Sequence, residues 1–239
     1  MIKKAILILS ICLFVVSAYS QKQKDFKPYW NVGVGFGPTF SSVDFAESAT
    51  TVGTAIRTKN LSQFHGGIAV RYITEKNLGF IVEMNYSQQG WEQDFSRMGD
   101  LKNEGYVHSH KTNYFEMPFL THIYFGRKLR FVINLGPKIS FLMSEKEELN
   151  DALTSYLASG KAPSNFVTHQ YYRDLDKKFD YGIIGGLGVE FQTGIGNFML
   201  EGRYYFGLAD IYNNSKADYF SRSANRVISA KLTYYVKLF

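Results

Sequence analysis

The chain has 239 residues, which fits one domain, since all-β barrels of this length form a single unit. Its 16% aromatic content and only 5 prolines exclude a disordered chain. Of the formal net charge of +6, Lys3 and Lys4 supply two units, and the rest is scattered without a basic stripe, which argues against nucleic-acid binding.

The first twenty residues have the order of a secretory signal peptide. The two lysines precede an apolar core at 5–16, and the small residues Ala18 and Ser20 follow it. A core of about 12 residues suits a signal and is too short to span a membrane. We therefore predict a signal peptide at 1–20, with cleavage between Ser20 and Gln21, and a short periplasmic segment at 21–28. The alternative is a buried N-terminal helix.

The only cysteine, Cys12, lies inside this signal. A lipoprotein would need a small residue before it, and Ile11 is not small. The mature chain then lacks disulfides, thiolate chemistry and cysteine-based metal sites.

Eight segments of the mature chain alternate apolar and polar residues. The last is the clearest, with Ile228, Ala230, Leu232, Tyr234, Val236 and Leu238 in one phase. The apolar phases of the other seven begin at Trp30, Phe64, Leu78, Phe115, Phe131, Phe179 and Phe198. Because side chains of a strand point to opposite faces with period two, we predict eight strands. The mature sequence has no apolar run long enough for a membrane helix.

The connections between these segments alternate in length. Short turns are expected at 74–77, 126–128 and 193–196. Long polar loops are expected at 40–61, 92–111, 143–177 and 212–224. This alternation is typical of outer-membrane barrels, whose short turns are periplasmic and whose long loops are extracellular. We predict an all-β fold, an eight-stranded antiparallel up-and-down transmembrane β-barrel, over residues 29–239.

A soluble lipocalin-like barrel would point its apolar face inward, whereas a membrane barrel points it outward. The polar phase is rich in glycine, which suits a crowded lumen, and aromatic residues lie near strand ends at Trp30, Tyr72, Tyr86 and Phe191. These features favour the outer membrane of a Gram-negative-type bacterium. The final residue, Phe239, falls in the polar phase, so we expect either a bulge near Lys237 or a variant insertion signal.

Four motifs in order resemble the PorT-like outer-membrane β-barrel family. They are the runs at 114–120 (YFEMPFL), 135–142 (LGPKISFL), 179–190 (FDYGIIGGLGVE) and 201–211 (EGRYYFGLADI). The resemblance spans residues 29–239 and implies an outer-membrane barrel of about eight to ten strands. One founding member of the family is linked to type IX secretion and gliding.

Charged residues of both signs fall in the inward phase. They are Arg71, Glu83, Glu116, Arg130, Lys138, Asp180, Glu190, Glu201, Arg203 and Lys231. Unpaired charges are costly away from water, and an eight-stranded interior is filled by its own side chains. We predict a structural network of salt bridges that plugs the lumen. A narrow polar path for ions or small solutes is the alternative.

Other chemistry has little support in the sequence. We find no nucleophile set with an oxyanion loop, so we expect no enzyme and no cofactor. His108 and His110 could chelate a metal from one strand face, but further ligands are not close, and a solvated loop is expected. His65, His122 and His169 are isolated. The glycine run at 182–188 lacks the Lys-Ser/Thr of a phosphate-binding loop.

The long loop at 143–177 contains one expected helix. Ser144 and Glu147 form a capping box, and Gly160 can end the helix. Its apolar face would consist of Leu149, Leu153, Tyr156 and Leu157. This face must pack against the barrel mouth, another loop or a partner, and a loop that packs on itself as a lid is the simplest interpretation.

These observations predict a non-enzymatic barrel with a packed polar lumen that acts as a structural or interaction protein through its extracellular loops. A transport role, as a narrow pore or as an accessory of protein secretion, is the alternative. Expected partners are outer-membrane lipid and lipopolysaccharide, the barrel-assembly machinery and a protein at the extracellular loops; nucleic acid is not among them.

Overall fold

The computed structural model describes residues 26–47, 56–96, 105–160, 168, 170–214 and 220–238. The predicted signal peptide, the first part of the 21–28 segment, His169 and Phe239 lie outside the described residues. The elements are β1 (Tyr29–Glu47), β2 (Thr58–Lys59), β3 (Leu61–Glu75), β4 (Leu78–Gln93), β5 (His108–Gly126), β6 (Leu129–Leu149), α2 (Asp151–Ala158), β7 (Phe179–Thr193), β8 (Gly196–Gly207) and β9 (Phe220–Lys237).

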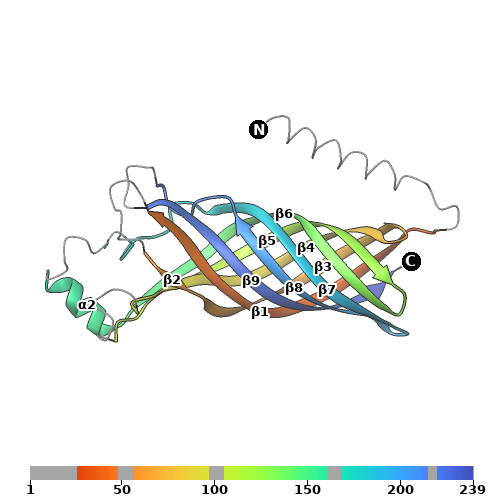
Figure 1. Ribbon diagram of the computed structural model, residues 1–239, viewed down its shortest axis with the longest axis horizontal. Coiled ribbons are helices and arrows are strands. Elements are labelled where there is room, and N and C mark those ends of the chain that lie inside the picture. The colour runs from red at the N-terminus through yellow and green to blue at the C-terminus, as the bar shows by residue number, and fades with distance from the viewer. Residues whose placement is uncertain are drawn as a thin grey trace.

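Eight long strands form a closed antiparallel barrel (Figure 1). Each long strand pairs with its neighbours in the sequence, and β1 closes the ring by pairing with β9. The two-residue β2 pairs with the outer part of β4. The predicted eight-stranded up-and-down barrel is therefore confirmed.

Three short turns lie at one end of the barrel. They consist of Lys76–Asn77, Arg127–Lys128 and Gly194–Ile195, within the predicted ranges. Asn77 has φ of 73°, in the left-handed region that asparagine tolerates in tight turns. The helix α2 lies beyond the opposite end (Figure 1). In an outer-membrane barrel the turn end is periplasmic and the α2 end is extracellular.

The apolar phase of each strand faces outward, as the membrane barrel requires. Phe36 and Leu187 are 68% and 66% exposed, whereas Arg71, Glu83 and Lys231 are fully buried inside. Exposed apolar side chains in a ring are unfavourable in water and favourable in lipid, which rules out the soluble barrel. Near the periplasmic end, Trp30 and Tyr72 stack at 4.4 Å. None of the described helices has the length and apolarity to cross a bilayer.

The strands continue further on the extracellular side than the sequence pattern predicts. β1, β4 and β6 run to Glu47, Gln93 and Leu149, and β5 already begins at His108. The expected loops at 40–61, 92–111 and 143–177 are thus shorter. The outer parts of β5 and β6 are polar on both faces and so show no apolar alternation. They are held by cross-strand polar pairs such as Lys111–Glu148, 2.7 Å apart.

The helix in the 143–177 segment begins later than expected. Ser144 and Glu147 lie in β6, so the predicted capping box is wrong, and Asn150 caps α2 by accepting a hydrogen bond from the Leu153 amide at 3.1 Å. A single polar residue directly before the first helical turn is enough to cap a helix, and Asn150 holds this position whereas Ser144 does not. The helix ends just before Gly160, as expected.

The closing strand β9 is regular to its last paired residue. Its pairing with β1 begins with Asn31 opposite Lys237 and reaches Glu47 opposite Phe220 at the extracellular end. The prediction of a bulge near Lys237 is wrong for the described part of the β1–β9 pair. The register shift of this pair lies between Ala46 and Glu47, at the extracellular end.

Candidate functional site in the lumen and at the extracellular mouth

The centre of the lumen contains an ion-pair network from three strands. Arg203 of β8 donates from both terminal nitrogens to the two carboxylate oxygens of Glu83 on β4, each at 2.8 Å. Lys231 of β9 donates to the same carboxylate at 2.7 Å, and Arg203 also contacts Glu201 at 2.7 Å. All four side chains are buried. The network therefore ties opposite walls of the barrel together.

A second group of ion pairs lies nearer the periplasmic end. Glu190 of β7 contacts Arg71 at 2.7 Å and Arg130 at 3.5 Å. The Arg71 guanidinium also lies 4.1 Å from the centre of the Tyr235 ring. A Cβ on Gly33 would lie 2.6 Å from that ring, so glycine makes room for it.

The remaining predicted lumen residues lie on the extracellular side of the centre. Lys138 forms an ion pair with Glu116, and its ammonium lies 3.5 Å from the centre of the Tyr205 ring. Asp180 accepts a hydrogen bond from Asn225 at 2.9 Å and, among the described residues, forms no ion pair within 4.0 Å. All ten predicted charged residues thus point inward, and nine of them join ion pairs.

Neutral polar residues complete the network, and they were not among the predicted site residues because only charges were considered. Asn85 accepts from Lys231 at 3.0 Å, and Asn134 donates to Glu201 at 2.8 Å. His122, expected to be isolated, lies 2.7 Å from the Asn134 side-chain oxygen. These three residues fall in the inward-facing phase of their strands, and this position is the sequence signal that could have identified them. His65 lines a cavity of about 20 Å³, room for one water molecule.

A cluster of buried apolar side chains lies at the extracellular mouth, above the charges. Its buried members are Val43, Phe45, Ile56, Trp91, Leu175, Ile211, Tyr212 and Phe220. Phe45 makes edge contacts with Trp91 at 5.2 Å and with Phe220 at 5.1 Å between ring centres. Strands β1, β4 and β9 meet here with the segments before β2, before β7 and after β8. We call this cluster the mouth plug.

The histidines of the 108–110 motif are buried beside the mouth plug. Nε2 of His108 lies 2.8 Å from Glu147, and Nε2 of His110 lies 2.7 Å from Glu145. The expectation of a solvated loop is wrong, because β5 extends to His108. Burial lowers the pKa of the His108 imidazole, and Glu147 opposes this shift. Within the described residues no cluster of three or more metal-ligating side chains is present.

The two glutamates also anchor the chain that leads into β7. Glu145 accepts from the backbone amide of Leu175 at 3.0 Å, and Glu147 accepts from that of Tyr172 at 2.9 Å. The segment around 170–178 is thereby held to the outer part of β6.

The predicted interaction residues belong to a third cluster beyond the mouth. Leu153 is fully buried with Phe95 and Tyr171, and Leu149, Tyr156 and Leu157 pack against them with Tyr106. The apolar face of α2 is therefore covered by its own extracellular segments. The outer, polar face of α2 is left exposed.

An outward apolar band, a charged lumen and a folded extracellular end define an integral outer-membrane β-barrel. The family model described as outer membrane protein beta-barrel domain matches residues 19–213, and the chain belongs to this family. None of the curated proteins matches the chain in sequence.

Solved barrels resemble the chain at low identity. Ail of Yersinia pestis is 11% identical, with 87% of this chain and 99% of that chain covered and a TM-score of 0.41. Neisserial surface protein A is 9% identical, and the match covers 87% of this chain and 99% of that chain with a TM-score of 0.42. Outer membrane protein W of E. coli is 15% identical, and the match covers 85% of this chain and 97% of that chain with a TM-score of 0.34. Family membership rests on the sequence match.

Proposed function

We propose that this barrel does not conduct and acts as a structural and interaction protein of the outer membrane through its extracellular part. The observation that supports this proposal is the double closure of the lumen. The ion-pair network fills the centre, and the mouth plug covers it. The cavity beside His65 in this section of the lumen has a volume of about 20 Å³, which is room for one water molecule.

A planar bilayer tests the closed lumen. Purified full-length protein should insert without producing single-channel steps. As a positive control for the assay, the same bilayer should record steps from an open porin. Sustained steps from the wild-type protein would contradict the proposal and favour the narrow pore.

The interaction role can be tested in intact cells with a photo-crosslinking amino acid. Tyr172, 67% exposed on the extracellular side, is the test position, and Ile195, 75% exposed in a periplasmic turn, is the control. We expect a discrete adduct from position 172 that is absent at position 195. If neither Tyr172 nor the exposed Thr154 of α2 gives an adduct, the extracellular part has no stable protein partner.

A second candidate is an accessory role in protein secretion of the type IX kind. Its support is the order of four PorT-like motifs, all of which lie on β5 to β8 and the segment directly after β8. Co-purification of the crosslinked protein with secretion components would favour this role. Recovery of adducts without any such component would count against it.

We also propose the route by which the protein reaches the membrane. The N-terminal signal is removed between Ser20 and Gln21, and the barrel-assembly machinery inserts the mature chain. Mass spectrometry of the purified protein tests the cleavage, since a mature chain that does not begin at Gln21 contradicts it.

A further inference from the structure

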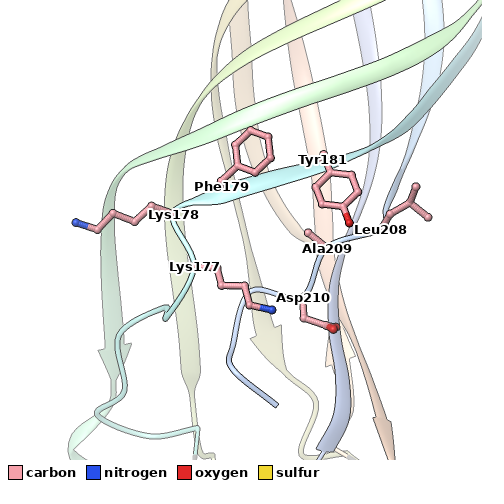
Figure 2. A pocket seen from close by; sticks show the side chains of 7 residues that line it. All are labelled: Lys177, Lys178, Phe179, Tyr181, Leu208, Ala209 and Asp210. Atoms are coloured by element: carbon pink, nitrogen blue, oxygen red, sulfur yellow. The ribbon is translucent and has the colours of Figure 1, made fainter. Parts of the chain in front are cut away.

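The outer wall of the barrel contains a pocket at its extracellular rim. It has a volume of about 460 Å³ and is lined by Lys177, Lys178, Phe179, Tyr181, Leu208, Ala209 and Asp210 (Figure 2). These residues come from the start of β7 and from the chain just after β8. We call it the rim pocket.

The rim pocket forms because two neighbouring strands end at different heights. Pairing between β7 and β8 stops at Gly182 opposite Gly207, whereas β7 continues to pair with β6 as far as Phe179. The chain after β8 covers the gap through backbone hydrogen bonds. Leu208 donates to Tyr181 at 2.9 Å, and Lys177 donates to Ile211 at 3.1 Å. The pocket is therefore a fixed recess in the wall.

Apolar and charged groups of the rim pocket are ordered along the barrel axis. β7 runs from the extracellular end toward the periplasmic turn, so Lys177 and Lys178 lie farther out than Tyr181. Phe179, Tyr181 and Leu208 are about half exposed and continue the outward apolar band. The recess is thus apolar on its membrane side and charged on its outer side. This is the orientation of an outer-leaflet lipid, with its head outside and its chains toward the bilayer.

Positive charge predominates at the outer side of the recess. Lys177 and Lys178 have no ion-pair partner within 4.0 Å among the described residues, while Asp210 accepts a hydrogen bond from the Ser223 amide at 2.8 Å. In Figure 2 the Lys177 side chain points toward Asp210, and the Lys178 side chain points away from the other labelled residues. Arg222 adds a guanidinium 3.4 Å from the carbonyl of Gly207, next to Leu208.

We propose that the rim pocket binds the phosphorylated head of an outer-leaflet lipid, with the acyl chains lying over Tyr181 and Leu208. Lys177, Lys178 and Arg222 supply the cations, because ammonium and guanidinium groups bind phosphate through charge-assisted hydrogen bonds. The apolar side chains below them select a lipid over a free phosphate, since only a lipid covers their exposed surface.

Binding of diphosphoryl lipid A to the purified full-length protein in a zwitterionic detergent tests the proposal. The variant Lys177→Gln/Lys178→Gln should bind it roughly thirtyfold more weakly, since each lysine near an anionic lipid surface contributes about 1 kcal/mol. The matched control is Lys76→Gln/Lys128→Gln, which removes two exposed lysines from the periplasmic turns. The control variant should bind like the wild type.

Two further probes separate the sources of the phosphate. Dephosphorylated lipid A should bind at least tenfold more weakly than the diphosphoryl form, because it lacks the charged head. Inorganic phosphate at millimolar concentration should not displace the lipid. Unchanged binding by Lys177→Gln/Lys178→Gln, an equal loss in the control variant, or displacement by inorganic phosphate would each overturn the proposal. Lys178, Lys76 and Lys128 are exposed and Lys177 is half-buried, and a folded-barrel gel shift checks that both variants fold.

Discussion

Arg203 forms two of the three ion pairs at the centre of the lumen. Its guanidinium binds Glu83 with both terminal nitrogens and also contacts Glu201, and all three side chains are buried. Buried ion pairs offset the loss of hydration only when their geometry is good and their remaining hydrogen bonds are made. Here Lys231 and Asn134 supply further donors to the two glutamates. Removing Arg203 therefore leaves carboxylates in a dry lumen with too few partners.

The substitution Arg203→Met should lower the free energy of unfolding by about 3 kcal/mol, the low end for breaking a buried pair. Lys231 still faces Glu83, which keeps the loss from being larger. Urea unfolding of the barrel in lipid vesicles, followed by tryptophan fluorescence, measures the change.

The exposed pair Lys59–Glu92 provides the comparison for Arg203. Its atoms lie 2.7 Å apart, but the lysine side chain is 54% exposed. Lys59→Met should therefore cost about 1 kcal/mol or less. If Arg203→Met costs no more than Lys59→Met, the lumen network does not stabilise the barrel.

At the scale of single elements, the strand cores were predictable from the sequence and their extracellular ends were not. The pattern of β9 is clear because one of its faces contacts lipid and the other the lumen. Beyond the membrane both faces of β5 are polar or covered by loops, so the period of two carries no apolar signal there. His108 and Lys111 are held by partners on β6, and contacts of this kind depend on register.

The same limit explains the misplaced start of α2. Ser144 and Glu147 have capping-box spacing, but their side chains bind Asn113 and His108 across the sheet. Pairing with β5 overrides the local helical signal, and the helix begins only where that pairing ends, after Leu149.

Asn150 should be the residue that fixes the start of α2. Its side-chain oxygen accepts from the Leu153 amide, and its side-chain nitrogen donates to the Gly105 carbonyl at 2.8 Å. Asn150→Ala should destabilise the helix by about 1 kcal/mol, which is typical for loss of an N-cap. Hydrogen exchange of the amides in 151–158 should then become about fivefold faster.

Ser144→Ala is the matched control for the cap, since it removes the other candidate. It should leave exchange in α2 unchanged, because Ser144 bonds to Asn113 and lies outside the helix. Equal acceleration by both variants would mean that exchange in α2 reports on the β5–β6 pair instead of the cap.

For the whole molecule, alternation and turn lengths predicted the strand number, the topology and the inward charges. They could not predict which charges meet. Glu83 and Arg203 are 120 positions apart and lie on strands that are not neighbours in the sheet. Their contact depends on the tilt and stagger of the closed barrel, which no local pattern encodes. The mouth plug was missed for the same reason, because its members come from six separate segments.

Because the apolar phase faces outward, the stability cost of a charge on this face should depend on its depth in the membrane. Leu187 lies near the middle of β7 and is 66% exposed, whereas Ile195 lies in a periplasmic turn and is 75% exposed. In a bilayer, Leu187→Arg should cost about 2–4 kcal/mol, and Ile195→Arg should cost about 0–1 kcal/mol, because only the first places a charge in hydrocarbon. Urea unfolding in phosphatidylcholine vesicles measures both, with Tyr172→Arg as an extracellular control. Equal, small costs at all three positions would mean that the outer face of this barrel does not contact lipid.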